Sequence, residues 1–188
     1  MPTRKNVSLW RLMIWTCLIM IGGVFVLIGY AGPSRTLDRS VSGPQIIVNP
    51  ESIRLGVAKL MGTNIVFEGS GFKPKDSIFI TLIGPNKVEA IVAEAPIKPD
   101  GTFKAEVSKL TKAMEILRAD IGFNEKFKEI IIITQPPIPV GVYTVKVTSM
   151  LSDLTAQTKL TVKGPSVIDR LKDIIGKLTG KIQHKEAK

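Results

Sequence analysis

One uninterrupted apolar run, residues 12–31 (LMIWTCLIMIGGVFVLIGYA), constrains this 188-residue chain more than any other stretch. Its only plainly polar side chain is that of Thr16. A helix of that length rises about 30 Å, which matches the hydrocarbon thickness of a bilayer. Trp10 and Trp15 at one end and Tyr30 at the other stand where interfacial aromatic residues are enriched. The run therefore predicts a transmembrane helix.

A cleaved signal peptide is the alternative to a retained anchor. Arg4, Lys5 and Arg11 form a positive n-region, and residues 29–31 resemble a small-x-small cleavage site. Retention is favoured because the run exceeds the roughly 7–15 apolar residues of a signal-peptide core. The same charges predict that residues 1–11 stay in the cytoplasm and that the rest of the chain lies outside it. We expect a single-pass protein of the cell (inner or plasma) membrane.

The net charge of +10 is concentrated at the two ends of the chain. Residues 40–162 carry 14 basic and 12 acidic side chains, whereas residues 163–188 carry seven basic and three acidic ones. A nucleic-acid-binding domain should show its basic residues on the folded body, so nucleic acid is not an expected partner. The excess at the C-terminus would suit an anionic lipid or a wall polymer.

No group of residues predicts catalysis, a metal or a cofactor. His184, the single histidine, lies in the C-terminal tail, and Cys17, the single cysteine, lies inside the apolar run. Asp76, Asp100 and Asp153 fall in expected turns, where a turn-forming role is favoured over calcium binding. We therefore expect a protein that is not an enzyme and that needs no cofactor.

After a polar linker over residues 32–44, the pattern becomes one of short β-prone runs separated by turn residues. Such spacing predicts a mainly β domain, an antiparallel sandwich or barrel, over residues 45–163. The expected strands cover residues 46–48, 52–58, 64–68, 77–83, 88–93, 102–107, 129–134, 141–149 and 154–162.

A helical insertion near residues 109–128 interrupts this pattern. Its helix is expected over residues 109–120, with Ser108 as N-cap. Phe123 and Phe127 are expected to extend its packing, and Leu117 is a candidate partner contact. Covering an open sheet end and binding a partner both remain open as its role. Apolar residues at spacings of three and four define its expected buried face: Leu110, Ala113, Met114, Leu117 and Ile121.

A basic amphipathic helix and tail are expected over residues 164–188. The helix begins near Ser166 and carries a stripe of aliphatic side chains at helical spacing. The stripe would lie on a membrane surface or a partner, or would pack against its own domain. The candidate contacts on this helix are Leu171, Lys172, Ile175, Lys177 and Leu178.

Residues 69–78 (GSGFKPKDSI) resemble a signature of the immunoglobulin-like, IPT/TIG-like domains of prokaryotic surface proteins. The later segments 99–103 (PDGTF), 139–143 (PVGVY) and 160–163 (LTVK) follow in the expected order. The resemblance implies an immunoglobulin-like antiparallel sandwich. It also implies structural roles, as turn, core or corner residues, for Gly69, Gly71, Phe72, Pro74, Asp76, Gly101, Gly141 and Tyr143.

Two non-enzymatic functions fit this organisation. One is an accessory or scaffold subunit of a membrane protein complex, with integral-membrane or extracytoplasmic protein partners. The other is a free-standing module for cell-surface adhesion or envelope-polymer binding. A single domain on a short tether, without stacked repeats, favours the first.

Overall fold

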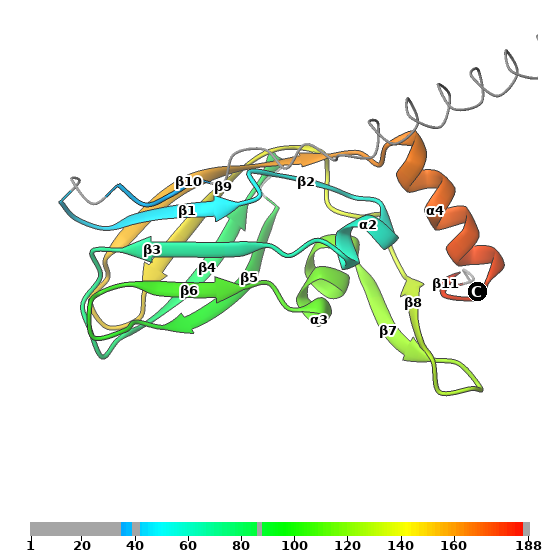
Figure 1. The fold of residues 1–188 in the computed structure, drawn as a ribbon, viewed down its shortest axis with the longest axis horizontal. Coiled ribbons are helices and arrows are strands. Elements are labelled where there is room, and N and C mark those ends of the chain that lie inside the picture. Colours follow the sequence, from blue (N-terminus) through cyan, green and yellow to red (C-terminus); the bar gives the residue numbers. More distant parts are fainter. Residues whose placement is uncertain (1–34, 39–41, 86–87, 186–188) are drawn as a thin grey trace, which may run out of the picture. The chain divides into compact units, whose positions relative to one another are not determined.

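In the computed structural model, residues 35–38, 42–85 and 88–185 are described, all within the compact unit Ser34–Lys188. The expected transmembrane segment, residues 12–31, lies outside the described residues. Among the helices of the described ranges, none is long and apolar enough to cross a bilayer. The described part is mainly β, as expected, and its strands form three sheets (Figure 1).

Two of these sheets build the body of the domain. In both, neighbouring strands are antiparallel except for β2, which runs parallel to β10. The small sheet has the order β1–β3–β6, and the large sheet has the order β2–β10–β9–β4–β5. The strands of the small sheet are β1 (Gln45–Asn49), β3 (Val66–Ser70) and β6 (Phe103–Glu106). Those of the large sheet are β2 (Ser52–Arg54), β10 (Thr155–Lys163), β9 (Gly141–Ser149), β4 (Ser77–Ile83) and β5 (Glu89–Pro96).

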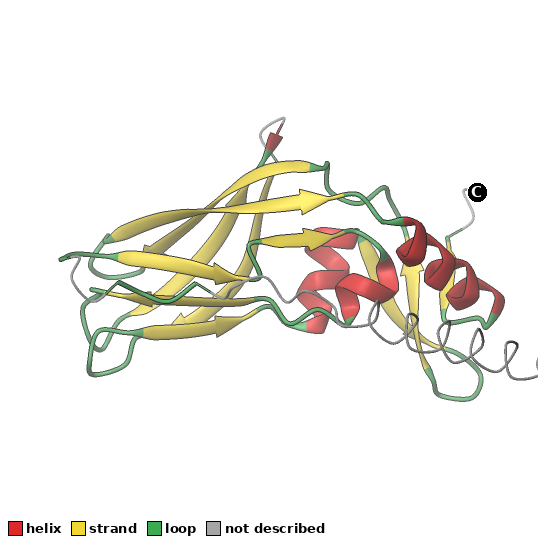
Figure 2. Cartoon of the chain, turned by 45° about the horizontal axis from the view of Figure 1, so that its top comes forward, coloured by secondary structure: helices red, strands yellow, loops and turns green. Residues whose placement is uncertain are grey.

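Alternation along the strands places one continuous core between the small and large sheets (Figure 2). Every second side chain of β4 and β9 is buried, because successive residues of a strand point to opposite faces. Phe67 and Phe103 of the small sheet belong to the same cluster as Ile80 of β4 and Tyr143 of β9. The strands over 77–83 and 141–149 have the bounds that this alternation predicts.

The remaining elements gather at one end of these two sheets (Figure 1). Their third sheet, the end sheet, has the order β11–β8–β7. Side chains such as Ile116, Ile131 and Ile182 join the same core cluster, so this end unit is continuous with the body. Its elements are α2 (Val57–Met61), α3 (Lys109–Thr111), the π-helical turn η2 (Lys112–Leu117), β7 (Ala119–Phe123), β8 (Glu129–Ile133), α4 (Val167–Leu178) and β11 (Ile182–His184).

Three expectations about these elements are wrong. The second strand ends at Arg54, and the last two residues of its expected range, 57 and 58, begin α2. Strand β8 pairs with β7 and β11 and belongs to neither sheet of the body. The insertion helix ends at Leu117, because Arg118 takes a left-handed conformation (φ 52°) and the chain then continues as β7.

The face expected to be buried on the insertion helix is confirmed only in part: Ala113 and Leu117 are 0% and 1% exposed. Leu110 and Met114 are 55% and 50% exposed, whereas Lys112 is only 5% exposed. The cause is the π-helical winding of η2, in which more residues make up each turn than in an α-helix. Spacings of three and four therefore no longer trace one face.

Candidate interaction surfaces

Five glycine and aromatic residues form the chain reversal after β3. Gly71 has φ +81° and Gly101 has φ +76°, both in the left-handed region that favours glycine. The two segments meet where the Phe72 N–H donates to the Gly101 carbonyl at 3.2 Å. Phe72 is buried and packs edge-to-face on Phe103, with ring centroids 5.4 Å apart. A Cβ on Gly69 would overlap that second ring, so the residue must be glycine there.

Asp76 joins the start of β4 to the turn between β9 and β10. Its carboxylate accepts hydrogen bonds from the Ser77 and Leu151 N–H groups at 2.7 and 3.0 Å. The Ser152 N–H and hydroxyl donate to it at 3.0 and 2.9 Å. Burial alone would raise the pKa of Asp76, but these hydrogen bonds outweigh it and hold the pKa below its ordinary value of 3.8. Pro74 lies in the exposed turn just before it.

Tyr143 and Gly141 lie at the start of β9. The Tyr143 side chain is fully buried, and its hydroxyl donates to the Pro139 carbonyl at 2.9 Å, four residues upstream. Such a bond is the mark of a tyrosine corner. Gly141 has φ +154°, and a Cβ there would lie 2.8 Å from Pro85 Cγ. The residues singled out by the resemblance therefore lie in turns and in the core of the body.

Short helix α2 is capped at both ends by side chains that lie far away in the sequence. At its N-terminus, the Asp173 carboxylate accepts from the Val57 and Ala58 N–H groups at 3.0 and 2.9 Å. At its C-terminus, Lys112 Nζ donates to the carbonyls of Met61 and Thr63 at 3.3 and 3.0 Å. Each charge has the sign that the helix dipole favours at that end. A carboxylate from α4 and an ammonium from η2 thus hold α2 between them.

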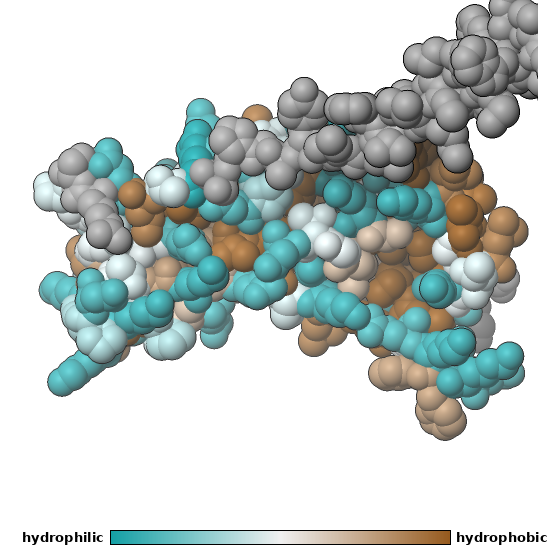
Figure 3. Space-filling model, viewed as in Figure 1, coloured by the Kyte–Doolittle hydropathy of each residue, from teal (hydrophilic) through white to brown (hydrophobic). Residues whose placement is uncertain are grey.

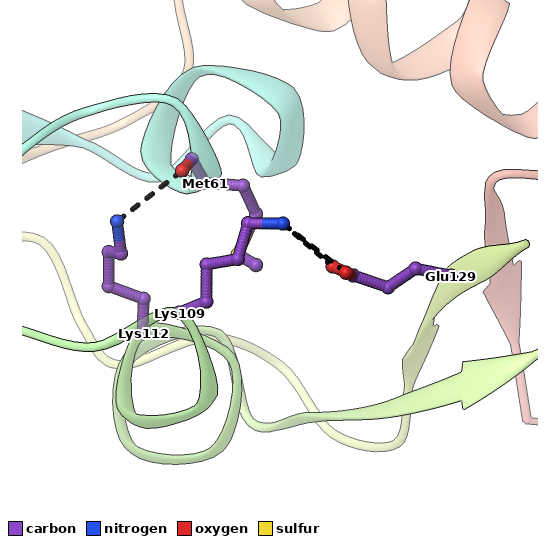
Figure 4. A network of polar contacts seen from close by, with 4 residues as sticks. All are labelled: Met61, Lys109, Lys112 and Glu129. Carbon is purple, nitrogen blue, oxygen red and sulfur yellow. Dashed lines mark hydrogen bonds and ion pairs between the residues drawn. The ribbon is translucent and has the colours of Figure 1, made fainter.

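Figure 4 shows the C-terminal half of this arrangement, with the Lys112 ammonium directed at α2. Burial lowers the pKa of Lys112, since it disfavours the charged ammonium. The neighbouring Lys109 turns the other way and forms an ion pair with Glu129 of β8 at 3.2 Å. Together these contacts connect the insertion to α2 and to the end sheet.

Helix α4 begins with a capping box and docks through its polar side. The Ser166 hydroxyl accepts from the Asp169 N–H at 3.2 Å, and the Asp169 carboxylate accepts from the Ser166 N–H at 2.9 Å. Burial alone would raise the pKa of Asp169, but the hydrogen bonds from Ser166 lower it below its usual range. Gly56 and Gly176 permit close packing: a Cβ on the first would lie 2.6 Å from Asp169 Cβ, and one on the second 2.6 Å from Ile182 Cδ1.

The opposite side of α4 carries what we call the α4 stripe. Its six aliphatic side chains are 52–83% exposed, and hydrophobic surface gathers over α4 in Figure 3. Three of the candidate contacts, Leu171, Ile175 and Leu178, lie in this stripe, and the other two on this helix, Lys172 and Lys177, are exposed beside it. The alternative that the predicted stripe packs on its own domain holds only for its last member, Ile182, which is 6% exposed and lies in β11. It is wrong for the six side chains on α4. They are Val167, Ile168, Leu171, Ile174, Ile175 and Leu178.

Four further large apolar side chains of the insertion are exposed, and together we call them the insertion patch: Leu110 and Met114 on its helical part, and Phe123 and Phe127 at its hairpin. These side chains are 55%, 50%, 69% and 89% exposed, so the expectation that they are buried is wrong. Phe123 and Phe127 lie at the end of the β7–β8 hairpin. Conversely, Leu117, the expected partner contact of the insertion, is 1% exposed and belongs to the core. Of the four exposed side chains, only Met114 lies in the π-helical turn itself.

Sequence reasoning missed the structural roles of Asp173 and Lys112, since capping across 116 and 51 residues leaves no local pattern. The distribution of charge on α4 was the one sequence feature that could have indicated its docked side. Both acidic residues of the helix fall opposite its stripe on a helical wheel. In the described ranges, no group of three or more His, Cys, Asp or Glu residues could hold a metal ion.

Comparisons with known proteins identify no family. No protein-family model matches the chain, and no curated protein matches it. A solved structure of macromomycin is similar over 64% of this chain and 99% of its own, with 12% sequence identity and a TM-score of 0.39. A similarity at that TM-score establishes neither a shared fold nor a shared ligand.

Proposed function

We propose that this chain is a non-catalytic, single-span membrane protein that presents an immunoglobulin-like sandwich outside the cytoplasm as an accessory or scaffold subunit of a membrane protein complex. The apolar run over residues 12–31 supports the anchor, and the positive charges before it support the orientation. The strand orders β1–β3–β6 and β2–β10–β9–β4–β5, with one core between the sheets, support the immunoglobulin-like assignment.

The insertion patch is the observation that carries the proposal of a protein partner. Its four large side chains contribute little to the core of their own domain, since each is at least half exposed. Aromatic residues and methionine are enriched in protein interfaces, and the patch holds two phenylalanines and one methionine. Charges of both signs surround the hairpin end, at Glu125, Lys126 and Lys128. Such a mixed rim around an apolar centre suits another protein surface.

An ion pair joins the helical part of the insertion to its hairpin. Lys109 precedes Leu110 and pairs with Glu129, which faces Phe123 across the β7–β8 ladder. The helical and hairpin parts of the patch are therefore connected by an ion pair.

Extraction in a mild detergent tests the proposal. The full chain, isolated through a C-terminal tag, is sized on a native gel, and co-eluting proteins are identified by mass spectrometry. We expect stoichiometric integral-membrane partners. Their loss in the double variant Phe123→Ser/Phe127→Ser would place the partner at the insertion patch. The control is Leu151→Ser, because Leu151 is 80% exposed in the turn between β9 and β10. A lone species of monomer or dimer size for the wild-type chain would contradict the proposal and favour a free-standing adhesion or envelope-binding module.

A further inference from the structure

We propose that the α4 stripe lies on the surface of an anionic bilayer and so holds the end unit against the membrane. The proposal deepens the proposed function and rests on its membrane anchor. Helix α4 has 12 residues, so it is about 18 Å long and too short to span a bilayer. Its geometry is that of a helix lying in the plane of the membrane interface.

The first argument is the orientation of α4 on its own domain. A surface helix of a globular protein normally turns its apolar face to the core. Here the polar side is docked instead, through Asp173 on the α2 N-terminus and through the close approach of Asp169 to Gly56. Both ends of the stripe are open, since Val167 is 83% and Leu178 82% exposed. The domain therefore holds the stripe outward and leaves it uncovered.

The second argument is the charge around the stripe. Both acidic side chains of the helix are engaged in hydrogen bonds: Asp173 with the α2 N-terminus, and Asp169 with Ser166 in the capping box. The exposed charged residues of the helix are Arg170, Lys172 and Lys177, all of them basic. Basic side chains bordering an apolar face are the mark of helices that bind anionic lipid surfaces.

A third argument comes from composition and reach. The stripe contains only valine, isoleucine and leucine, whereas the insertion patch carries the aromatic and methionine side chains enriched in protein interfaces. The stripe therefore lacks the aromatic and methionine residues that are enriched in protein interfaces. The linker over residues 32–44 spans at most about 45 Å when extended, so the expected anchor keeps the domain near the bilayer. Tethering raises the effective concentration, so a weak interfacial helix suffices.

Fluorescence in lipid nanodiscs tests the proposal with the full chain. In a Cys17→Ser background, Leu178→Cys is labelled with an environment-sensitive fluorophore, because Leu178 is 82% exposed. Single copies are reconstituted in phosphatidylcholine nanodiscs with or without phosphatidylglycerol. We expect a blue shift, and quenching by lipid-borne nitroxide, in anionic nanodiscs only. High salt should reverse both, since the screening length falls from about 10 Å at 0.1 M to about 3 Å at 1 M.

Two matched variants make the result specific. The same label on Gln157→Cys, an exposed position of β10, should show no shift. The charge reversal Arg170→Glu/Lys177→Glu should abolish the shift of the Leu178→Cys probe, while circular dichroism stays that of the parent. Neither charged side chain makes a hydrogen bond or ion pair in the described part of the chain, so folding should be unaffected.

Several outcomes would overturn the proposal. A probe that stays water-exposed in both lipids excludes membrane contact, and an equal shift in both lipids excludes the anionic preference. A shift seen only in the complex isolated with its partners shows that a protein covers the stripe. Because the nanodisc holds one copy and no partner, failure here leaves the detergent experiment on the insertion patch unaffected. The two proposals can therefore fail separately.

Discussion

Replacing Asp173 by alanine is the sharpest test of how α4 is held. The substitution removes the carboxylate that accepts from the Val57 and Ala58 N–H groups at 3.0 and 2.9 Å. It leaves the α4 stripe and the capping box at Ser166 unchanged. If α4 docks through α2, this one change should both destabilise the domain and loosen the α2 N-terminus.

The expected loss follows from the exposure of the two donors. Val57 is 7% exposed, so its freed N–H stays largely without water, at a cost of about 1–2 kcal/mol. Ala58 is exposed, so water replaces most of its lost bond. The removed charge at a helix N-terminus adds roughly 0.3–1 kcal/mol. We expect a total of about 2 kcal/mol, or about 4–8 °C in melting temperature for a domain of this size.

Thermal unfolding in detergent measures the total loss of stability. Hydrogen exchange over residues 55–61 shows whether that loss is located at the α2 N-terminus. Asp120→Ala is the control, because the exposed Asp120 carboxylate makes no hydrogen bond or ion pair in the described part of the chain. The variant Asp173→Asn retains one acceptor oxygen, so its melting temperature should fall between those of Asp173→Ala and Asp120→Ala. If Asp173→Ala has the same melting temperature as the control, and hydrogen exchange over residues 55–61 is unchanged, the docking contact does not hold α4.

Three further predictions concern the body and the buried lysine. Tyr143→Phe loses the hydroxyl that donates to Pro139, so we expect a loss of about 1 kcal/mol in chemical denaturation. Gly69→Ala drives a methyl group into the aromatic ring across the strand pair and should destabilise by about 1–3 kcal/mol, whereas Gly62→Ala, with its nearest neighbour at 3.4 Å, should change little. The pKa of Lys112 is lowered by burial, so between that lowered value and 10.5 the unfolded chain binds a proton that the folded chain lacks. The unfolding free energy should therefore rise with pH across that window, and a pH series on Lys112→Met should lack this rise.

Much of the body could be predicted from the sequence because its signals are local. Strands β4 and β9 alternate along their whole length, and their bounds were predicted correctly. The turn at Gly101 was also predicted, since proline followed by Asp-Gly favours a reversal and φ there is +76°. The N-cap at Ser108 was predicted because serine is a preferred N-cap residue, and its side chain accepts from the Thr111 N–H.

The end unit could not be predicted in the same way, because its determinants are distant in the sequence. Helix α2 has no side-chain N-cap of its own and contains Val57, so an alternating strand was the natural interpretation. The π-helical winding of η2 buries Lys112 and exposes Met114, and no local sequence pattern predicts that winding. The stripe of α4 was predicted from its spacing, but its position on the solvent-exposed side of the helix was not. That position depends on Asp173, whose partners Val57 and Ala58 lie far away in the sequence.

The capping of α2 also has a consequence for how this chain is made. A helix of five residues does not form stably on its own. Its C-terminal cap leaves the ribosome about 50 residues later and its N-terminal cap 116 residues later. Helix α2 therefore lacks its N-terminal cap until α4 has been synthesised. A chain that ends before Asp173 should keep residues 57–61 open to proteases. Proteolytic cleavage within residues 57–61 would then distinguish a chain without Asp173 from one that contains it.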